Sequence, residues 1–428
     1  MFGLYRLLSH LALPVVLAQL ATRCVRDSAY RPRISERFGF GREQSDQSTI
    51  WIHAVSAGEV IAISPIVETL SEQYTDLRFL LTATTPSGSE EVKRRFGDRV
   101  SHVYAPYDLR GCVQRFLKNQ NPKLLILVET ELWPNLIDLV HRANIPIYVV
   151  NARLSEKSAS GYQKVRGLTS NMLQKITHIA CQYEDTADRF KALGATENQL
   201  SVTGSVKFDI KLPDQLEQET ENLQDQWCFG RPTWIAASTH APEEQIALLA
   251  HQRIQAEIND AFLILVPRHP PRQHEVEEVC NALGFAHSTI SKSPTRVPVL
   301  IVDRMGILLQ VLGMGSAVLI GGSFQGTGGH NPIEPAICGI PMIMGRDRHN
   351  FAEICSRFEE VNALKIVNDV EDIAQAVISL LTNKQAATEM ANAAYKVVEL
   401  NRGAKNQVLN LMHSWITQAI DQSDSKSG

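Results

Sequence analysis

Several signatures of common catalytic and metal-binding classes are missing from this chain of 428 residues. No D-x-D triplet occurs, so there is no obvious acidic ligand pair for a Mg²⁺–nucleotide complex. Neither G-x-x-x-x-G-K-[ST] nor G-x-S-x-G is present, which argues against a P-loop enzyme and an α/β-hydrolase. The seven cysteines are odd in number and form no C-x-x-C. They indicate a reducing compartment rather than a disulfide framework or a zinc site.

Charge of either sign is also modest. The net charge of −4 gives no electrostatic reason to expect a nucleic-acid partner. A hydrophobic content of 44% and a charged content of 21% are typical of a folded globular protein. Because the chain is too long for one ordinary core and shows no short repeat, we expect two domains.

An apolar segment near the start departs from this profile. Between Leu7 and Thr22 there is no formal charge apart from what His10 carries. The run is shorter than the about 20 residues of a membrane span. Four arginines follow it closely: Arg23, Arg26, Arg31 and Arg33. The positive-inside rule then places the rest of the chain in the cytoplasm. We expect residues 1–30 to be an uncleaved signal-anchor or a helix lying on the membrane; a cleaved signal peptide and a buried amphipathic helix are the alternatives.

Strand and helix candidates alternate in two blocks, which predicts two mostly parallel sheets covered on both faces. The strand candidates of the first block are residues 49–53, 78–82, 124–128, 145–150, 176–181 and 199–204. Those of the second block are residues 234–237, 262–266, 299–302, 317–320 and 341–344. Residues 373–420 have an entirely helical pattern.

The predicted fold class is α/β, with two Rossmann-like domains that face each other across a cleft. Ligands of such sheets bind outside the carboxyl ends of the strands. Residues 31–212 form the first domain, and residues 228–428, terminal helices included, form the second. The stretch 213–227 between them is rich in Gln and Glu and lacks apolar periodicity, so we expect a linker there.

The most informative stretch is the glycine-rich segment 328–336, G-G-H-N-P-I-E-P-A, which lies between two strand candidates. Strand, glycine-rich turn, helix and strand make the pattern of a nucleotide-binding α/β layer. Pro332 suits the first position of a helix, so the three preceding residues would leave their N–H groups free for a phosphate: Gly329, His330 and Asn331. Glu334, in the first turn, could accept hydrogen bonds from ribose hydroxyls. A capped helix without a ligand is the alternative.

Charged residues follow the strands of the first block. Glu59 stands at the entry of the helix after 49–53, where a carboxylate could act as a general base or merely favour the helix dipole. Glu129 and Glu131 follow 124–128 beside Trp133, and charge at that position costs desolvation, which favours a function. Lys207 precedes the predicted linker and could project into the cleft.

Polar residues follow the strands of the second block as well. Arg268, after 262–266, has a planar fork that binds oxyanions such as phosphate. Met305 and Gly306, after 299–302, could let a flat base lie against thioether and backbone, although core filling is the alternative for Met305. A cleft without a metal must neutralise a leaving phosphate with N–H groups, Arg and Lys, and those groups are present.

In this order, the motifs resemble those of the 3-deoxy-D-manno-octulosonic acid (Kdo) transferases, inverting glycosyltransferases of the GT-B fold. The resemblance is carried by residues 51–59, 129–135, 207–209, 238–240, 267–269 and 329–334. It implies that Glu59 is the catalytic base and that Glu129 and Lys207 stabilise the transition state. It also implies donor contacts at the following positions: Pro267, Arg268, Met305, Gly306, Ile307, Gly329, His330, Asn331, Pro332, Ile333 and Glu334. The chain departs from the family pattern at Ser205-Val206, where we expect Asn-Leu, and at Ile307, where Glu is frequent.

The resemblance implies transfer of Kdo from CMP-Kdo to lipid IVA, the lipid A precursor, with inversion at the anomeric carbon, in lipopolysaccharide core biosynthesis. No metal or other cofactor is expected. The implied partners are CMP-Kdo, lipid IVA and the membrane lipid surface, at the cytoplasmic face of the inner membrane of a Gram-negative bacterium. A UDP-sugar 2-epimerase built on the same plan and a non-catalytic nucleotide-sugar-binding module are the alternatives. No motif reports how many Kdo units are added.

Overall fold

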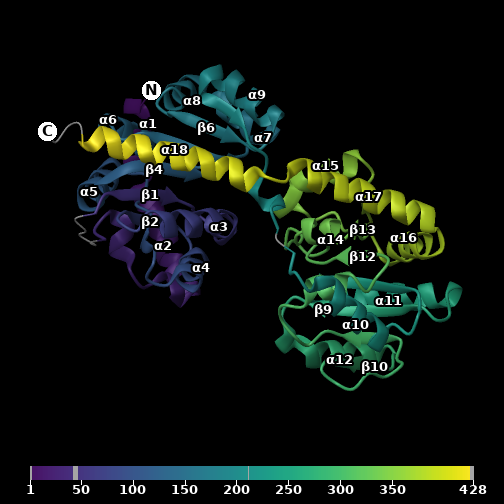
Figure 1. The fold of residues 1–428 in the computed structure, drawn as a ribbon. Coiled ribbons are helices and arrows are strands. Elements are labelled where there is room, and N and C mark those ends of the chain that lie inside the picture. Colours follow the sequence, from purple (N-terminus) through teal and green to yellow (C-terminus); the bar gives the residue numbers. More distant parts are fainter. Residues whose placement is uncertain (1, 42–46, 211, 425–428) are drawn as a thin grey trace. The chain divides into compact units, whose positions relative to one another are not determined.

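The computed structural model describes residues 2–41, 47–210 and 212–424. The chain divides into two compact units, Met1–Asp209 with Arg402–Gly428 and Ile210–Asn401. Each unit is built on one parallel sheet of seven strands (Figure 1). The prediction of two Rossmann-like α/β units is therefore confirmed.

The sheet of the first unit has the order β3-β2-β1-β4-β5-β6-β7. β1 and β4 are neighbours in the sheet but not in sequence. After β1 the chain continues to β2 on one side, and after β4 it continues to β5 on the other side. The carboxyl ends of β1 and β4 form the topological switch point, where ligands of such sheets bind. The strands are β1 (Thr49–His53), β2 (Arg78–Ala83), β3 (Ser101–Tyr104), β4 (Pro122–Val128), β5 (Ile147–Ala152), β6 (His178–Cys181) and β7 (Leu200–Val202).

Alternating side chains of these strands bury both faces of the sheet. In β1, Ile50 and Ile52 join one core cluster and Trp51 the other. The first cluster includes residues of α3 (Ala57–Gln73), α4 (Pro86–Phe96) and α18 (Ala404–Asp424). The second includes residues of α5 (Arg110–Gln120), α6 (Pro134–Arg142), α8 (Arg166–Leu173) and α9 (Glu184–Leu193), with α7 (Glu156–Lys164) packed beside α9.

The sheet of the second unit has the order β10-β11-β9-β8-β12-β13-β14, so its switch point lies between β8 and β12. Its strands are β8 (Thr233–Thr239), β9 (Phe262–Pro267), β10 (His287–Thr289), β11 (Val299–Ile301), β12 (Val318–Ile320), β13 (Met342–Met344) and β14 (Leu364–Ile366). Its helices are α10 (Leu216–Trp227), α11 (Glu243–Glu257), α12 (Gln273–Ala282), α13 (Leu308–Leu312), α14 (Ile333–Ile337), α15 (Ala352–Glu360), α16 (Val370–Thr382) and α17 (Lys384–Asn401).

The predicted linker at residues 213–227 is wrong, because most of it is α10. A stripe of partly or fully buried side chains runs along one side of this helix, at Leu216, Thr220, Leu223 and Trp227. Their spacing of three to four residues is helical, and the intervening Gln and Glu side chains face water. α10 packs against α13, and the Thr220 hydroxyl donates to the carbonyl of Gln310 at 3.3 Å.

The last helix also departs from the predicted domain boundaries. Residues 373–420 are helical apart from short breaks, but α18 returns to the first unit, across which it lies as the yellow helix of Figure 1. The Trp415 ring stacks on Tyr148 of β5 with 4.1 Å between ring centroids. At the start of the helix, the Asp209 carboxylate accepts hydrogen bonds from the backbone N–H groups of Gly403, at 2.8 Å, and Lys405, at 2.5 Å.

The apolar N-terminal segment forms two helices, α1 (Phe2–Leu11) and α2 (Leu13–Arg26), with a bend of 48° between them. Among the described residues, no single helix has the length and hydropathy of a membrane span, whereas this bent pair meets both criteria jointly.

α1 docks on the first unit along one side only. The Tyr5 hydroxyl donates to Asp108 at 2.8 Å, and the Lys175 ammonium lies 3.9 Å from the centroid of the Phe2 ring. The other side of α1 leaves large apolar side chains exposed: Leu4, Leu7, Leu8 and Leu11. The segment is therefore neither a fully buried core helix nor separate from the folded unit.

Candidate active site

Glu59 is held at the switch point of the first sheet by the turn that starts α3. Ser56 is the N-cap of this helix, and its hydroxyl accepts the N–H of Glu59 at 3.3 Å and donates to the Glu59 carboxylate at 2.8 Å. The N–H of Val55 donates to the other carboxylate oxygen at 2.8 Å. This reciprocal capping pattern fixes the position of the carboxyl group, which is 7% exposed.

The environment of Glu59 favours its protonated form. Burial raises the pKa of Glu59 to about 8, and the negative charges of Glu129 and Glu131 act in the same direction. The hydrogen bonds from Ser56 and Val55 oppose the rise. A carboxyl group with a pKa near neutrality can both take up and release a proton, as general acid–base chemistry requires. Glu59, after β1, therefore lies close enough to Glu129 and Glu131, after β4, for their charges to raise its pKa.

Glu129 is the most constrained residue of this group. Its backbone φ of 61° lies in the left-handed region, which a side chain other than glycine seldom adopts outside strained or functional turns. Its buried carboxylate is paired on both oxygens, with Lys207 Nζ at 2.8 Å and Arg153 Nε at 2.5 Å. The predicted residues Glu129 and Lys207 are therefore in contact. Arg153 was not predicted, and its position directly after β5 is the only sequence signal for it.

Two aromatic rings bridge the same switch point. The His53 ring, at the end of β1, is fully buried and packs edge-on against Trp133, 4.6 Å between centroids. Its Nδ1 lies 2.9 Å from the Thr82 hydroxyl, and burial lowers the pKa of His53 to about 3, so the ring is neutral. Its Nε2 is buried and has no hydrogen-bond partner among the residues that the structure describes.

At the switch point of the second sheet, two histidines meet. His240 follows β8 and His330 follows β12; their Nε2 atoms are 2.9 Å apart and their rings are stacked with an interplanar angle of 11°. Burial lowers the pKa of His330 to about 4, with further lowering from the charges of His240, Arg268 and His269. One ring nitrogen must donate and the other accept, so at least one ring is neutral. Burial also lowers the pKa of His240, and with both pKa values lowered the pair is neutral near pH 7.

The glycine-rich turn does not leave the N–H groups free that were expected to hold a phosphate. The N–H of Gly329 donates to the carbonyl of Gly322 at 2.7 Å, and that of His330 to Gly321 at 3.1 Å. The positive φ of Gly329 allows the turn to fold back on the end of β12, where a Cβ atom would lie 2.3 Å from Met344. The prediction for these two N–H groups is therefore wrong.

The helix that follows this turn is short and begins one residue later than predicted. α14 has only five residues and begins at Ile333, with Pro332 as its N-cap residue. The side-chain oxygen of Asn331 accepts the N–H of Ile333 at 3.0 Å. The dipole of so short a helix gives little help to an anion. Binding of a phosphate at this position would depend on side chains.

Glu243 is a second residue whose role was missed. It is 1% exposed, and its carboxylate accepts four backbone N–H groups: those of Gly322 at 2.7 Å, Ser323 at 2.8 Å, His240 at 3.0 Å and Phe324 at 3.2 Å. The anion that organises residues 322–324, on which the glycine-rich turn folds back, is thus the protein's own. The sequence signal was an acid in the opening turn of α11, which also fits an ordinary favourable helix dipole.

Arg268 and Glu334 lie near each other at this edge of the second unit. Arg268 follows β9 and is exposed. Burial raises the pKa of Glu334, and the charge of Arg268 and a hydrogen bond with Asn331 oppose the rise. The structure therefore brings Arg268, His330, Asn331 and Glu334 together.

The remaining predicted donor contacts are spread along the carboxyl edge of the sheet. Pro267 is the last residue of β9, and Pro332 and Ile333 are buried. Met305 follows β11 and is 68% exposed, so the core-filling alternative is wrong. Gly306 has a positive φ of 82°, and Ile307 is the N-cap residue of α13.

Comparison with solved structures identifies the fold class of this architecture. A uridine diphosphate N-acetylglucosamine 2-epimerase from Neisseria meningitidis, solved with UDP-GlcNAc, superposes with a TM-score of 0.54 at 14% identity, covering 86% of this chain and 100% of that chain. At this identity the likeness shows the fold alone. The two parallel sheets, each with its polar loops at the switch point, make this an α/β protein of the GT-B-like class.

Sequence relatives give the family. The family model for 3-deoxy-D-manno-octulosonic-acid transferase (kdotransferase) matches residues 32–210. The 3-deoxy-D-manno-octulosonic acid transferase of Haemophilus influenzae is 38% identical over 95% of this chain and 97% of its own length. That of Bordetella pertussis is 30% identical, over 86% and 87%. The chain belongs to the family of 3-deoxy-D-manno-octulosonic acid transferases, which are glycosyltransferases.

Proposed function

We propose that this protein transfers Kdo from CMP-Kdo to lipid IVA with inversion at the anomeric carbon. The observation that carries the proposal is the buried Glu59 carboxyl, with a pKa of about 8, beside the Glu129–Lys207 pair. The family relatives of high coverage support the same reaction class.

In this proposal Glu59 is the general base. It takes the proton of an acceptor hydroxyl as that oxygen attacks the anomeric carbon of Kdo, and the bond from this carbon to the phosphate oxygen of CMP breaks on the opposite face. The configuration at the carbon inverts, and CMP leaves with the electron pair of the broken bond. The hydrogen bonds from Val55 and Ser56 hold the carboxylate in position, so little reorganisation accompanies the proton transfer.

Lys207 would stabilise the charge that develops as CMP departs. An ammonium group that is already fixed before the reaction is worth more than one that must be ordered during it. Glu129 supplies that fixation by pairing with Lys207 at 2.8 Å, and Arg153 balances the second Glu129 oxygen. Glu129 is thus a positioning residue, held by its own strained backbone.

The nucleotide of the donor is assigned to the second unit. Because the N–H groups of Gly329 and His330 are already used, Arg268 is the strongest remaining group for the phosphate. Glu334 and Asn331 can bind hydroxyls of the ribose, and the exposed Met305 can lie against the cytosine ring.

The proposed location is the cytoplasmic face of the inner membrane, where a lipid acceptor resides. The exposed leucines of α1 support this location, because a water-exposed apolar stripe on a docked helix suits a lipid interface.

The test is a release assay on the full-length protein in detergent, with CMP-Kdo in the presence and absence of lipid IVA, followed by mass spectrometry of the lipid. The proposal expects CMP release that depends on the acceptor and a lipid product that carries Kdo. CMP-Kdo binding without release would indicate a binding module. Interconversion of UDP-sugars without any CMP release would indicate the epimerase alternative. Either result would overturn the proposal.

A further inference from the structure

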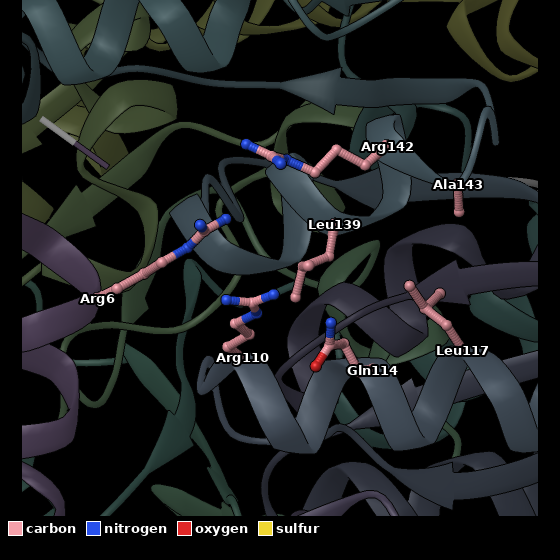
Figure 2. A pocket seen from close by; sticks show the side chains of 7 residues that line it. All are labelled: Arg6, Arg110, Gln114, Leu117, Leu139, Arg142 and Ala143. Carbon is pink, nitrogen blue, oxygen red and sulfur yellow. The ribbon is translucent and has the colours of Figure 1, made fainter. Parts of the chain in front are cut away.

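A second site candidate lies in the first unit, apart from the residues above. An open pocket of about 320 Å³ is lined by residues of α1, α5 and α6 (Figure 2). Its three arginines are Arg6 on α1, Arg110 at the start of α5 and Arg142 at the end of α6. Figure 2 shows these arginines on one side of the pocket and Leu117 and Ala143 on the other. None of the described residues that line it is acidic.

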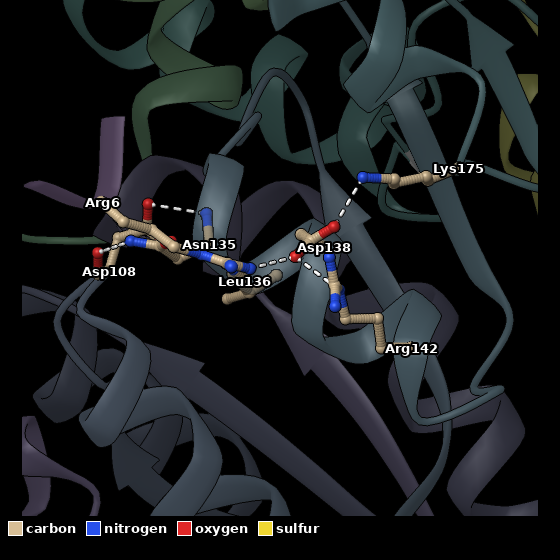
Figure 3. Close-up of polar contacts among 7 residues, drawn as sticks. All are labelled: Arg6, Asp108, Asn135, Leu136, Asp138, Arg142 and Lys175. Atoms are coloured by element: carbon tan, nitrogen blue, oxygen red, sulfur yellow. Dashed lines mark hydrogen bonds and ion pairs between the residues drawn. The ribbon is translucent and has the colours of Figure 1, made fainter. Parts of the chain in front are cut away.

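The positive charge of the pocket is only partly balanced. Asp138 pairs with Arg6, with Arg142 at 2.9 Å and with Lys175 at 2.6 Å (Figure 3). One carboxylate therefore serves three cations. Among the described residues, none forms a hydrogen bond or ion pair with the exposed Arg110 guanidinium, and the buried Nε of Arg6 has no hydrogen-bond partner. A buried unpaired donor of this kind is rare unless a ligand satisfies it.

The helix that contributes Arg6 also presents an apolar stripe to water. The stripe consists of four exposed leucines spaced as one face of a helix: Leu4, Leu7, Leu8 and Leu11. Tyr5 and Arg6 point the other way, to Asp108 and Asp138. An apolar face and a separate cationic face on one surface helix are the combination that binds an anionic lipid surface.

We infer that the pocket binds the phosphate of an anionic phospholipid headgroup while the leucine stripe enters the acyl region of the same leaflet. The planar guanidinium forks of the arginines match phosphate oxygens, and the pocket's apolar wall can cover the glycerol carbons. The inference rests on the proposed membrane location, but it adds a defined lipid site that the transfer reaction itself does not require.

The occupant is assigned to bilayer phospholipid rather than to the reacting acceptor. α6 starts next to the Glu129–Trp133 loop at the carboxyl edge of the sheet, and Arg142 is its last residue. The Arg142 guanidinium points back along the helix to Asp138, and Arg110 begins α5 close to Asp108, which caps the start of α6. Bilayer phospholipid is favoured by the exposed leucine stripe of α1, the helix that also carries Arg6, and turnover on detergent-dispersed acceptor tests the alternative.

The first test measures binding of the full-length protein to vesicles of phosphatidylcholine with and without phosphatidylglycerol. Arg110→Glu should weaken binding to the anionic vesicles by about thirtyfold, since it reverses a basic charge that would contact the headgroup phosphate in the pocket. Lys118→Glu, on an exposed position of the same helix outside the pocket, is the matched control and should change binding by less than about threefold. Equal losses in the two variants would show diffuse attraction without a pocket and would overturn the inference.

The second test separates the sources of phosphate. On detergent-dispersed acceptor, Arg110→Glu should keep turnover within about twofold of the unmodified protein. A large loss of turnover there, with vesicle binding intact, would place the acceptor's own phosphate in the pocket. Displacement of bound protein from anionic vesicles by millimolar inorganic phosphate, but not by chloride of equal ionic strength, would show a soluble-anion site. Either outcome would overturn the lipid assignment, and vesicle binding needs no donor, so the result is independent of the transfer chemistry.

Discussion

The two units carry a glutamate at the same place in their topology, at the start of the helix that follows the first strand of each sheet. Glu59 lies in the first turn of α3 after β1, and Glu243 is the first residue of α11 after β8. Both side chains are buried and both stand beside a switch point. Their topological positions are alike, yet their surroundings differ in two measurable respects.

The first difference is the number of donors. Glu243 accepts four backbone N–H groups, three of them from residues 322–324 on another strand's loop. Glu59 accepts two hydrogen bonds, both from its own helix-start turn. A carboxylate that is fully satisfied by fixed N–H groups is a structural anion that joins two loops.

The second difference is the charge of the neighbours. Glu59 faces the negative charges of Glu129 and Glu131, and together with burial these raise its pKa to about 8. The comparison teaches that an acid at a strand end acquires its role from its donors and neighbours, not from its position. Four predictions test this comparison between the two units.

The largest effect is expected when the charge balance of the first unit is disturbed. Lys207→Met should lower kcat by about 10²- to 10³-fold, because a pre-positioned cation is lost where negative charge develops. The measurement is initial-rate CMP release at saturating substrates. Lys164→Met, an exposed lysine of α7, is the control. A variant at position 207 that retains a third of the activity would remove Lys207 from the reaction.

In the second unit, replacing the matching glutamate should change the free energy of unfolding. Glu243→Gln should lower the free energy of unfolding by about 2–4 kcal/mol, because one amide oxygen cannot accept four N–H groups and the amide NH₂ opposes them. Urea unfolding followed by tryptophan fluorescence checks this, with the exposed Glu257→Gln on α11 as the control. Unchanged stability combined with lost turnover would mean that Glu243 takes part in the chemistry, and the contrast with Glu59 would fail.

A pH profile tests the raised pKa directly. If ionised Glu59 is the base, kcat/KM should fall about tenfold per pH unit below about 8 and level off above it. The free energy of unfolding should change with pH in the opposite direction to kcat/KM. A carboxyl group whose pKa is raised by folding contributes stability below its unfolded pKa, and this contribution is lost as the pH rises through about 8. Glu59→Gln should therefore melt at a higher temperature than the unmodified protein at pH 9. A profile that is flat from pH 6 to 9 would contradict the assignment.

The smallest effect concerns metal. EDTA should leave turnover essentially unchanged, because the acids at the second switch point are already engaged. Glu243 is occupied by N–H groups, and Glu244 is paired with Arg272 at 2.8 Å and accepts the Thr239 hydroxyl at 2.9 Å. Activity that disappears with EDTA and returns with Mg²⁺ would show that the donor phosphate is neutralised differently.

Central elements of the fold could be predicted because burial on both faces gives continuous apolar runs, as in residues 124–128 of β4. Of the short edge strands, β7 was predicted as residues 199–204, but β3, β10 and β14 could not be. β3 begins with Ser101 and His102, and β10 and β14 have three residues each, so their pairing is decided by tertiary contacts. α10 was missed because its buried stripe is narrow and includes a threonine.

For the site, Glu129 could be singled out because a charge after a buried strand has no packing use. Lys207 was singled out by its place before the expected linker, and its role came from the resemblance to the transferase family. Arg153 and Glu243 were not, because their roles depend on partners that only the fold brings near. Glu243 meets Gly322, which is 79 positions away in sequence. The prediction of free N–H groups in the glycine-rich turn was wrong for the same reason, because the turn folds back on the end of β12 and its N–H groups are bonded there.

The most direct test of the central claim is Glu59→Gln, measured for nucleotide binding and turnover in one preparation. The amide keeps the shape of the carboxyl group but cannot accept a proton. We predict unchanged CMP affinity and a fall in turnover of about 10²- to 10⁴-fold, while Glu72→Gln, an exposed glutamate on the same helix, stays at the unmodified level. A Glu59→Gln protein that keeps more than about a tenth of the turnover would contradict the account.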